Sequence, residues 1–216
     1  MKKYNIIAWD FNGTILDDIQ IGIESINVLL ERRGLRSIVT KEEYQSSFFF
    51  PIIEWYRSLG FDFEREDYTV VAREWVKEYT MRESRAGLCD GVTDLLGAFA
   101  EMGKRQIIIS ASEKNMLKRQ LSALGIEKYF EEIVGKDDVY ANGKTEAAKN
   151  WRKYNPGELL FIGDTDHDLE VAEAIGADCI LVAAGHQSYE RLRLLHKNKI
   201  NSLRVVKGSK DILNID

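Results

Sequence analysis

Three polar residues each come directly after a run of apolar residues typical of a buried strand. Asp10 follows "IIAW", Ser110 follows "RQIII", and Asp164 follows "ELLFIG". A second aspartate, Asp168, comes one helical turn later in "GDTDHD". Ligands of open parallel sheets bind at the carboxyl ends of the strands. Carboxylate and hydroxyl groups at such ends could serve binding or catalysis, so these residues are the first candidates for a functional site.

Each candidate also has a purely structural interpretation. Asp168 could cap the N-terminus of a helix, and Ser110 could cap the helix that begins near Glu113. A G-D-x-x-x-D pattern arises by chance in roughly a few per cent of chains of this length. Chance explains poorly why all three segments occur together, each at the end of a strand candidate. The sequence therefore favours one site at the strand ends.

The elements that must position these residues follow two patterns. After one short strand candidate, roughly 70 residues have the apolar spacing of helices only. From Gly91 onward, helices of about 10–12 residues alternate with apolar strands, which indicates right-handed crossover units and a parallel sheet. We predict an α/β core of residues 1–16 and 86–216, with an all-helical cap of residues 17–85 inserted after the first strand. A cap rooted there would lie over the strand ends as a lid.

The composition limits the classes of function. The 216 residues are 44% hydrophobic and 30% charged, with a net charge of −5. Acidic and basic residues are interleaved, whereas nucleic-acid binders usually carry a basic face. No apolar run approaches the ~18 residues that span a bilayer. Cys89 and Cys179 have neither metal-ligand nor disulfide-framework spacing. We therefore expect a cytoplasmic protein without nucleic-acid or membrane partners.

Four segments make the prediction more specific. In chain order they are "DFNGTILDD", "IIISAS", the lysine of "NGKTEAA", and "GDTDHDLEVAEAIGAD". They resemble the motifs of the haloacid dehalogenase-like hydrolase superfamily, in its phosphoglycolate-phosphatase-like and β-phosphoglucomutase-like branch. Together with the helical insertion they span the whole chain. The resemblance implies a Rossmann-like core with a helical cap, and a phosphatase that acts on a small phosphorylated molecule.

The resemblance also implies roles for the acidic residues. Asp10 matches the nucleophile, which attacks phosphorus and becomes an aspartyl-phosphate, and it matches a Mg²⁺ ligand as well. Asp164 matches the second metal carboxylate, and the backbone carbonyl of Asn12 a further ligand. Asp168 matches a residue that supports the metal indirectly or through water. Mg²⁺ suits such a set because it keeps several waters beside a few protein oxygens.

The phosphate-binding roles are likewise implied by the resemblance. Ser110 matches the hydroxyl residue that binds the phosphoryl oxygens, and Gly13 and Thr14 match the loop after the nucleophile. Lys144 matches the lysine that holds the nucleophile and phosphate together. Relatives often have a proline after this lysine where this chain has a threonine, so Lys136 stays open as the alternative.

Asn12 departs from the family pattern. Most phosphatases of this type have an aspartate there, which protonates the leaving oxygen and later activates water. An amide cannot exchange a proton in the usable pH range. General acid–base catalysis contributes typically ~10²–10⁴-fold, or roughly 3–5 kcal/mol of barrier. Asn12 therefore predicts an enzyme impaired on substrates with poor leaving groups, or one that stalls as the phospho-enzyme.

Three interpretations follow from this departure. The first, which we prefer, is a Mg²⁺-dependent phosphatase of a phosphoglycolate-like monoester that acts on a good leaving group or uses another base, with His167 and His186 as candidates. The second is a catalytically impaired or non-catalytic protein that binds a phosphate ligand. The third is a phosphonatase-type C–P hydrolase, which would use a cap lysine such as Lys41 or Lys77 as a Schiff base. Haloacid dehalogenases work without metal, and "GDTDHD" argues against them.

The cap is expected to select the substrate. The stretch "SSFFFPIIEWYRSLGFDF" is rich in aromatic residues, most of which we assign to the core of the cap. We expect one or two of them, with Arg57 or Arg82, to face the substrate and close over it. The same aromatic surplus could also form a dimer contact, so both a monomer and a homodimer are expected states.

Overall fold

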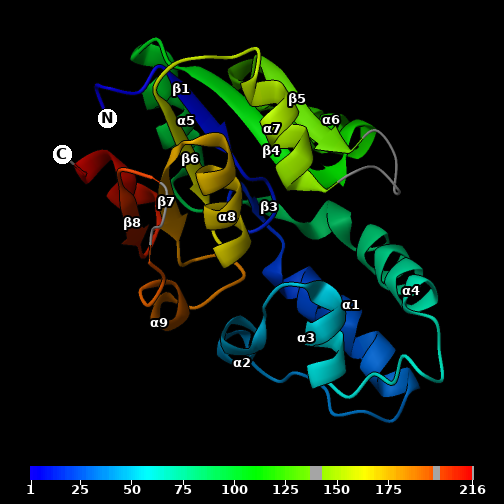
Figure 1. The fold of residues 1–216 in the computed structure, drawn as a ribbon. Helices are drawn as coiled ribbons and strands as arrows, with labels where there is room; N and C mark the ends of the chain where they lie inside the picture. The colour runs from blue at the N-terminus through cyan, green and yellow to red at the C-terminus, as the bar shows by residue number, and fades with distance from the viewer. Residues whose placement is uncertain (137–142, 197–199, 216) are drawn as a thin grey trace.

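A computed structural model shows a parallel sheet covered on both faces by helices, with a separate group of helices at one edge (Figure 1). The structure describes residues 1–136, 143–196 and 200–215, except for the side chain of Lys136. The strands of the main sheet are β1 (Ile6–Trp9), β4 (Arg105–Glu113), β5 (Glu132–Lys136), β6 (Leu159–Gly163), β7 (Asp178–Val182) and β8 (Leu203–Val206). Their order is β5-β4-β1-β6-β7-β8, and every pair is parallel. The predicted α/β class is confirmed.

The sheet is buried on both faces, which explains why its strands read as continuous apolar runs. The side chains of β1 alternate: Ile7 and Trp9 pack into one core layer, Ile6 and Ala8 into the other. The covering helices are α5 (Val92–Glu101), α6 (Lys114–Ala123), α7 (Lys144–Arg152), α8 (Asp166–Ile175) and the short α9 (Tyr189–Leu192). Buried side chains of α5 and α6 complete the first layer, and those of α7, α8 and α9 the second.

The inserted helices form a hydrophobic core of their own. They are α1 (Ile19–Arg32), α2 (Lys41–Ser47), α3 (Ile52–Ser58) and α4 (Tyr68–Thr80). Residues from Ile19 to Val71 make up this third cluster, separate from the two layers of the sheet. The chain enters and leaves the group through a two-stranded antiparallel ribbon of β2 (Leu16–Asp17) and β3 (Gly87–Leu88). The exact domain boundaries that we proposed stay a prediction.

Side chains at the N-termini of two helices determine where these helices begin. Helix α4 begins at Tyr68, because Asp67 caps it by accepting from the Thr69 N–H. Strand β4 continues beyond Ser110, and Glu113 rather than Ser110 caps helix α6. Within the described residues, no helix is long and apolar enough to cross a bilayer.

Candidate active site

The candidate residues meet where three adjacent strands end. Strand β1 lies between β4 and β6, so Asp10, Ser110 and Asp164 come to the same edge of the sheet. All three side chains are buried and line one cavity of about 460 Å³ between the sheet and the cap. The carboxylates of Asp10, Asp164 and Asp168 lie close enough for their ligand oxygens to be within 4.8 Å of one another. The topology alone therefore brings the four sequence candidates together.

Lys144 is the buried cation of this cluster. It is the first residue of α7, is 4% exposed, and donates to both Asp10 Oδ1 and Asp168 Oδ1. Burial alone would lower its pKa, but the two carboxylates hold the pKa above its ordinary value. The side chain of Lys136, the alternative candidate, lies outside the described residues. The geometry thus supports Lys144 as the lysine that contacts the nucleophile candidate.

Asp168 uses both oxygens for structural contacts. Thr165 caps α8, and Asp168 Oδ2 accepts from the Asp164 N–H at 3.0 Å and the Thr165 N–H at 3.0 Å in a capping box. Its other oxygen accepts from Lys144. Asp168 is therefore a capping-box residue inside the helix rather than the N-cap, and it anchors both the β6–α8 turn and the lysine.

Asp164 is oriented by groups from two other loops. Its Oδ1 accepts from the Thr14 hydroxyl at 2.9 Å, and its Oδ2 accepts from the His186 N–H at 2.6 Å. The hydroxyl of Thr14, which sequence reasoning assigned to the phosphate, is thus directed at Asp164. We infer that Thr14 positions a carboxylate.

Two carboxylates of the cluster have pKa values above the ordinary range of an aspartate. Burial raises the pKa of Asp10 to about 6, although Lys144 opposes the shift. Burial raises the pKa of Asp164 to about 8, with further repulsion from Asp168 and Asp10. Three buried carboxylates have one lysine, and His186 pairs with a fourth buried carboxylate, Asp18, so excess negative charge remains. A divalent cation bound by hard oxygen ligands would compensate it.

Asn12 has donor and acceptor partners that suit an amide. Its Nδ2 donates to Asp18 Oδ2 at 2.8 Å and to the Tyr79 hydroxyl at 3.0 Å, while its Oδ1 accepts from the Ser112 hydroxyl at 3.0 Å. Asp18 is 3% exposed and also accepts from the Gly13 N–H at 2.9 Å. A carboxylate at position 12 would face the Asp18 carboxylate, so the site around Asn12 is built for a neutral side chain.

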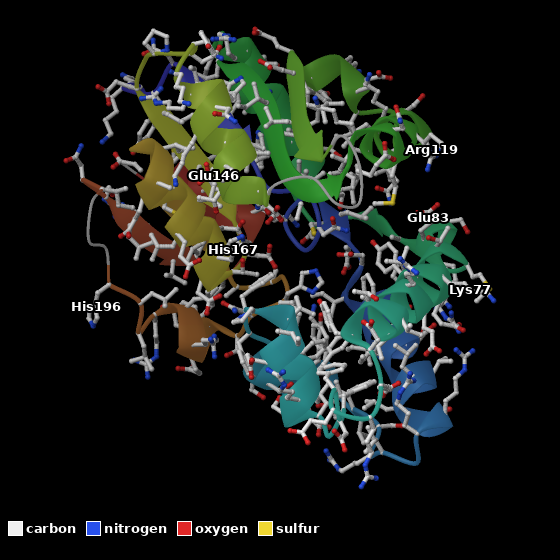
Figure 2. The ribbon with its side chains drawn as sticks, turned by 45° about the vertical axis from the view of Figure 1, so that its right-hand side comes forward. Lys77, Glu83, Arg119, Glu146, His167 and His196 are labelled. Carbon is white, nitrogen blue, oxygen red and sulfur yellow. The ribbon has the colours of Figure 1, made fainter. Side chains whose placement is uncertain are left out.

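His186 lies in the site, whereas His167 lies at the cavity rim. His186 Nε2 is 3.3 Å from Asp18 Oδ1, and its Nδ1 is 2.9 Å from the Tyr44 hydroxyl. Burial would lower the pKa of His186, but Asp18, Asp164 and Asp10 raise it to about 9. His167 pairs with Glu170 at 2.9 Å, and Figure 2 shows it on the side of the core that faces the cap.

The cap is fastened to the core by hydrogen bonds beside the site. Gln45 Nε2 donates to the Gly185 carbonyl at 2.6 Å, and the Ser188 N–H donates to the Gln45 carbonyl at 3.1 Å. The Tyr44–His186 and Tyr79–Asn12 contacts join cap side chains to core loops in the same region. The structure therefore shows the cap closed over the carboxylates.

The charged cap residues expected at the substrate lie elsewhere. Arg57 pairs with Glu54, and Arg82 pairs with Glu78 and Glu24. Neither arginine is part of the described cavity wall, so the expectation that one of them faces the substrate is wrong for this closed state. Lys41 and Lys77 are exposed and also absent from that wall. Figure 2 shows Lys77 on the outer side of the cap.

Sequence reasoning missed Asp18, Tyr79 and Ser112. Asp18 precedes α1 at the N-cap position, yet its side chain makes no capping bond and instead points back to the nucleophile loop. Its closeness in sequence to "DFNGT" could have identified it as a candidate site residue. Tyr79 is a cap residue with no local mark in the sequence, since its role depends on how the cap docks.

A substitution at Gly13 tests how closely the loop after Asp10 packs against its neighbours. Its φ is +74°, and an added Cβ would lie 2.3 Å from Asp164 Oδ2 and 2.4 Å from His186 Cδ2. We expect Gly13→Ala to lower the free energy of unfolding by roughly 1–3 kcal/mol in urea denaturation. Gly97→Ala is the matched control, because an added Cβ there meets nothing within 4 Å and should stabilise α5 by up to about 1 kcal/mol. A Gly13→Ala protein as stable as the parent would contradict the tight packing.

Comparisons with known proteins agree with this architecture. Residues 7–182 match the model of the haloacid dehalogenase-like hydrolase family. The chain is 23% identical over 178 residues to pyrophosphatase PpaX of Listeria monocytogenes, covering 79% of each protein. It is 26% identical over 192 residues to tyrosine-protein kinase PtkA of Mycobacterium tuberculosis, covering 84% of this chain and 62% of PtkA. A solved haloacid dehalogenase-like hydrolase from Streptococcus pneumoniae has the same fold, with TM-score 0.79, 18% identity and 100% coverage of both chains.

Proposed function

We propose that this chain, which belongs to the haloacid dehalogenase-like hydrolase family, is a phosphatase of small phosphate monoesters with Asp10 as its nucleophile. The observation that carries the proposal is the buried contact of Asp10 with Lys144 at the floor of the cavity. A lysine there holds the nucleophile and would attract the phosphoryl oxygens. The relative named as a pyrophosphatase supports phosphoryl chemistry of this kind.

Mg²⁺ fits the donor set of this site. Carboxylate and carbonyl oxygens are the ligands Mg²⁺ prefers, and the cluster has more negative charge than Lys144 balances. Asp10 and Asp164 would hold the ion with the carbonyl of Asn12, because each oxygen of Asp164 accepts only one hydrogen bond and keeps a lone pair. In Asp168, Oδ2 already accepts three hydrogen bonds and Oδ1 accepts from Lys144. A bound Mg²⁺ would offset the charge of the carboxylates and of the phosphoryl group.

The residues of the chain supply the remaining steps. A carboxylate oxygen of Asp10 attacks phosphorus, the ester P–O bond breaks, and an aspartyl-phosphate forms. Ser110 accepts from the Ser112 N–H at 3.1 Å, which leaves its hydroxyl proton for a phosphoryl oxygen. Water then attacks phosphorus and releases phosphate from Asp10. Asn12 cannot donate the proton in the first step or accept it in the second, so we expect the second step to be slow.

The non-catalytic alternative rests on the same residue. If Asn12 abolishes phosphoryl transfer altogether, the site would bind phosphate without forming an adduct. The C–P hydrolase alternative has less support, because Lys41 and Lys77 are exposed and away from the described cavity wall.

Trapping the phospho-enzyme tests the function directly. The protein is incubated with Mg²⁺ and acetyl phosphate, then with a panel of phosphate monoesters, and analysed by intact mass and peptide mapping. We expect one phosphoryl adduct on Asp10, formed in a burst that is followed by slow release of phosphate. Asp10→Asn and excess EDTA should both abolish it. Phosphate binding by calorimetry, with neither an adduct nor turnover on any compound, would favour the non-catalytic binder.

A further inference from the structure

The cavity above the carboxylates has an aromatic wall supplied by the cap. Its volume of about 460 Å³ is in the usual range for small-molecule sites. The aromatic side chains that line it are Tyr44, Phe48, Phe50, Trp55, Tyr56, Trp75 and Tyr79. Several of them also form the core of the cap, but Phe50 is 37% exposed and Trp75 is only partly buried. These two keep surface that a ligand can cover.

This wall begins beside Asn12. The rings of Trp75 and Tyr79 are stacked, with centroids 4.9 Å apart, and the Tyr79 hydroxyl is 3.0 Å from Asn12 Nδ2. The resemblance of the sequence motif implies that position 12 matches the group that protonates the leaving oxygen. The part of the substrate that leaves with this oxygen is therefore expected to lie against Trp75.

The described part of the cavity wall offers no additional cation to that leaving part. Among the described residues that line it, the cap supplies neither lysine nor arginine. Lys144 is held by Asp10 and Asp168, His186 faces Asp18, and His167 pairs with Glu170. A carboxylate or a second phosphate on the leaving group would thus be desolvated without a partner, which is costly. An uncharged aromatic group suits this wall better.

We propose that the substrates are aryl phosphates, in which a phenol-type oxygen is esterified to the phosphoryl group. This inference rests on the proposed phosphatase function and adds the substrate class. A phenol has a pKa of about 10, whereas that of water, close to an alkyl alcohol, is about 15.7. A phenolate leaves without a general acid, so the aromatic wall and Asn12 favour the same class.

The first step balances without a proton donor. A carboxylate oxygen of Asp10 forms a bond to phosphorus while the bond between phosphorus and the phenolic oxygen breaks. The bonding electrons leave with the phenolate, which takes a proton from water. Water then attacks phosphorus in the aspartyl-phosphate, and inorganic phosphate and the free carboxylate are released.

Four phosphate compounds separate leaving-group chemistry from pocket fit. Phenyl phosphate has both features, benzyl phosphate has the ring with an alkyl oxygen, cyclohexyl phosphate has neither, and acetyl phosphate has a good leaving group without a ring. We measure kcat/KM, which reports the first step, and expect phenyl phosphate to exceed benzyl phosphate by at least ~100-fold, the lower end of a general-acid contribution. Benzyl phosphate within tenfold of phenyl phosphate would overturn the proposal.

Binding supplies a readout that is independent of turnover. In Asp10→Asn protein, calorimetry should show phenyl phosphate binding about two- to tenfold tighter than cyclohexyl phosphate, the range expected for aromatic contacts. Trp75→Leu in that background should remove most of this difference. Tyr154→Leu is the matched control, because Tyr154 is 84% exposed and not part of the cavity wall. Equal binding of the two compounds, or equal effects of both leucine variants, would contradict the proposed aromatic fit.

The outcomes separate the two proposals. An Asp10 adduct from acetyl phosphate but not from phenyl phosphate would leave the phosphatase standing and reject the aryl class. No adduct or turnover with any of the four compounds would reject both. An adduct from phenyl phosphate, with the expected ratios of kcat/KM and binding, would support both.

Discussion

Asn12→Asp is expected to raise kcat/KM for benzyl phosphate by about 10²- to 10⁴-fold, the usual contribution of a general acid. The substitution puts a carboxyl group where the leaving oxygen needs a proton. Its new neighbour is Asp18, whose Oδ2 is 2.8 Å from the Asn12 amide nitrogen. Two carboxyls at that distance cannot both ionise easily, so one proton is retained between them. A retained proton is what an acid catalyst requires.

The same neighbour predicts a cost in stability. Asn12→Asp replaces a hydrogen bond to the buried Asp18 by repulsion, and we expect a lower free energy of unfolding than in the parent. The double variant Asn12→Asp/Asp18→Asn exchanges the two side chains and keeps one carboxylate and one amide in contact. It should recover part of the stability, but it should gain less on benzyl phosphate than Asn12→Asp does, because no second carboxyl beside position 12 retains the proton.

The increase in kcat/KM caused by Asn12→Asp is expected only for substrates with poor leaving groups. Phenyl phosphate needs no acid, so its kcat/KM should change by less than about tenfold. The ratio of kcat/KM for phenyl phosphate to kcat/KM for benzyl phosphate should therefore decrease strongly. Asn12→Ala, which removes the amide without adding an acid, should not improve benzyl phosphate. If Asp10 still forms its adduct but neither aspartate variant gains activity, the assignment of position 12 is wrong.

The arrangement of the core site could be predicted because it follows from topology. Asp10 and Asp164 follow strands that the apolar pattern identifies, and Ser110 lies in the last part of a third. Parallel strands present their carboxyl ends at one edge. Lys144 was harder to identify from the sequence, because "NGKTEAA" departs from the family pattern. Only the start of helix α7 at that residue, which directs its side chain between Asp10 and Asp168, distinguishes it in space.

The surroundings of Asn12 could not be predicted in the same way. Asp17 and Asp18 are adjacent and alike in sequence, but the first is exposed and the second is buried beneath the cap. Tyr79 reaches Asn12 and Asp18 from helix α4, about 60 residues later in the chain, and His186 reaches Asp18 from the loop after β7. Such contacts depend on how the cap docks. The sequence marks Asn12 as a missing acid, whereas the structure shows it as one half of a hydrogen-bonded pair.

Lys144→Met is expected to lower the free energy of unfolding of the metal-free protein by about 3–5 kcal/mol, as for other buried ion pairs that lose one partner. The substitution leaves Asp10, Asp164 and Asp168 buried together without the lysine that contacts two of them. Lys149→Met is the matched control on the same helix, because Lys149 and its partner Glu146 are 43% and 54% exposed. An exposed pair contributes at most about 1 kcal/mol. Urea denaturation of the two variants measures the difference.

The pH dependence identifies the cause of this loss. The pKa values of Asp10 and Asp164, about 6 and about 8, lie above the ordinary value of 3.8, so the folded state binds more protons than the unfolded chain. That contribution to stability is full below pH ~4 and is lost as the pH rises through both values. The deficit of Lys144→Met should therefore be larger at pH 8 than at pH 5, and Mg²⁺ should reduce it by compensating the carboxylates. A deficit independent of both pH and Mg²⁺ would mean that Lys144 stabilises the fold through packing rather than charge.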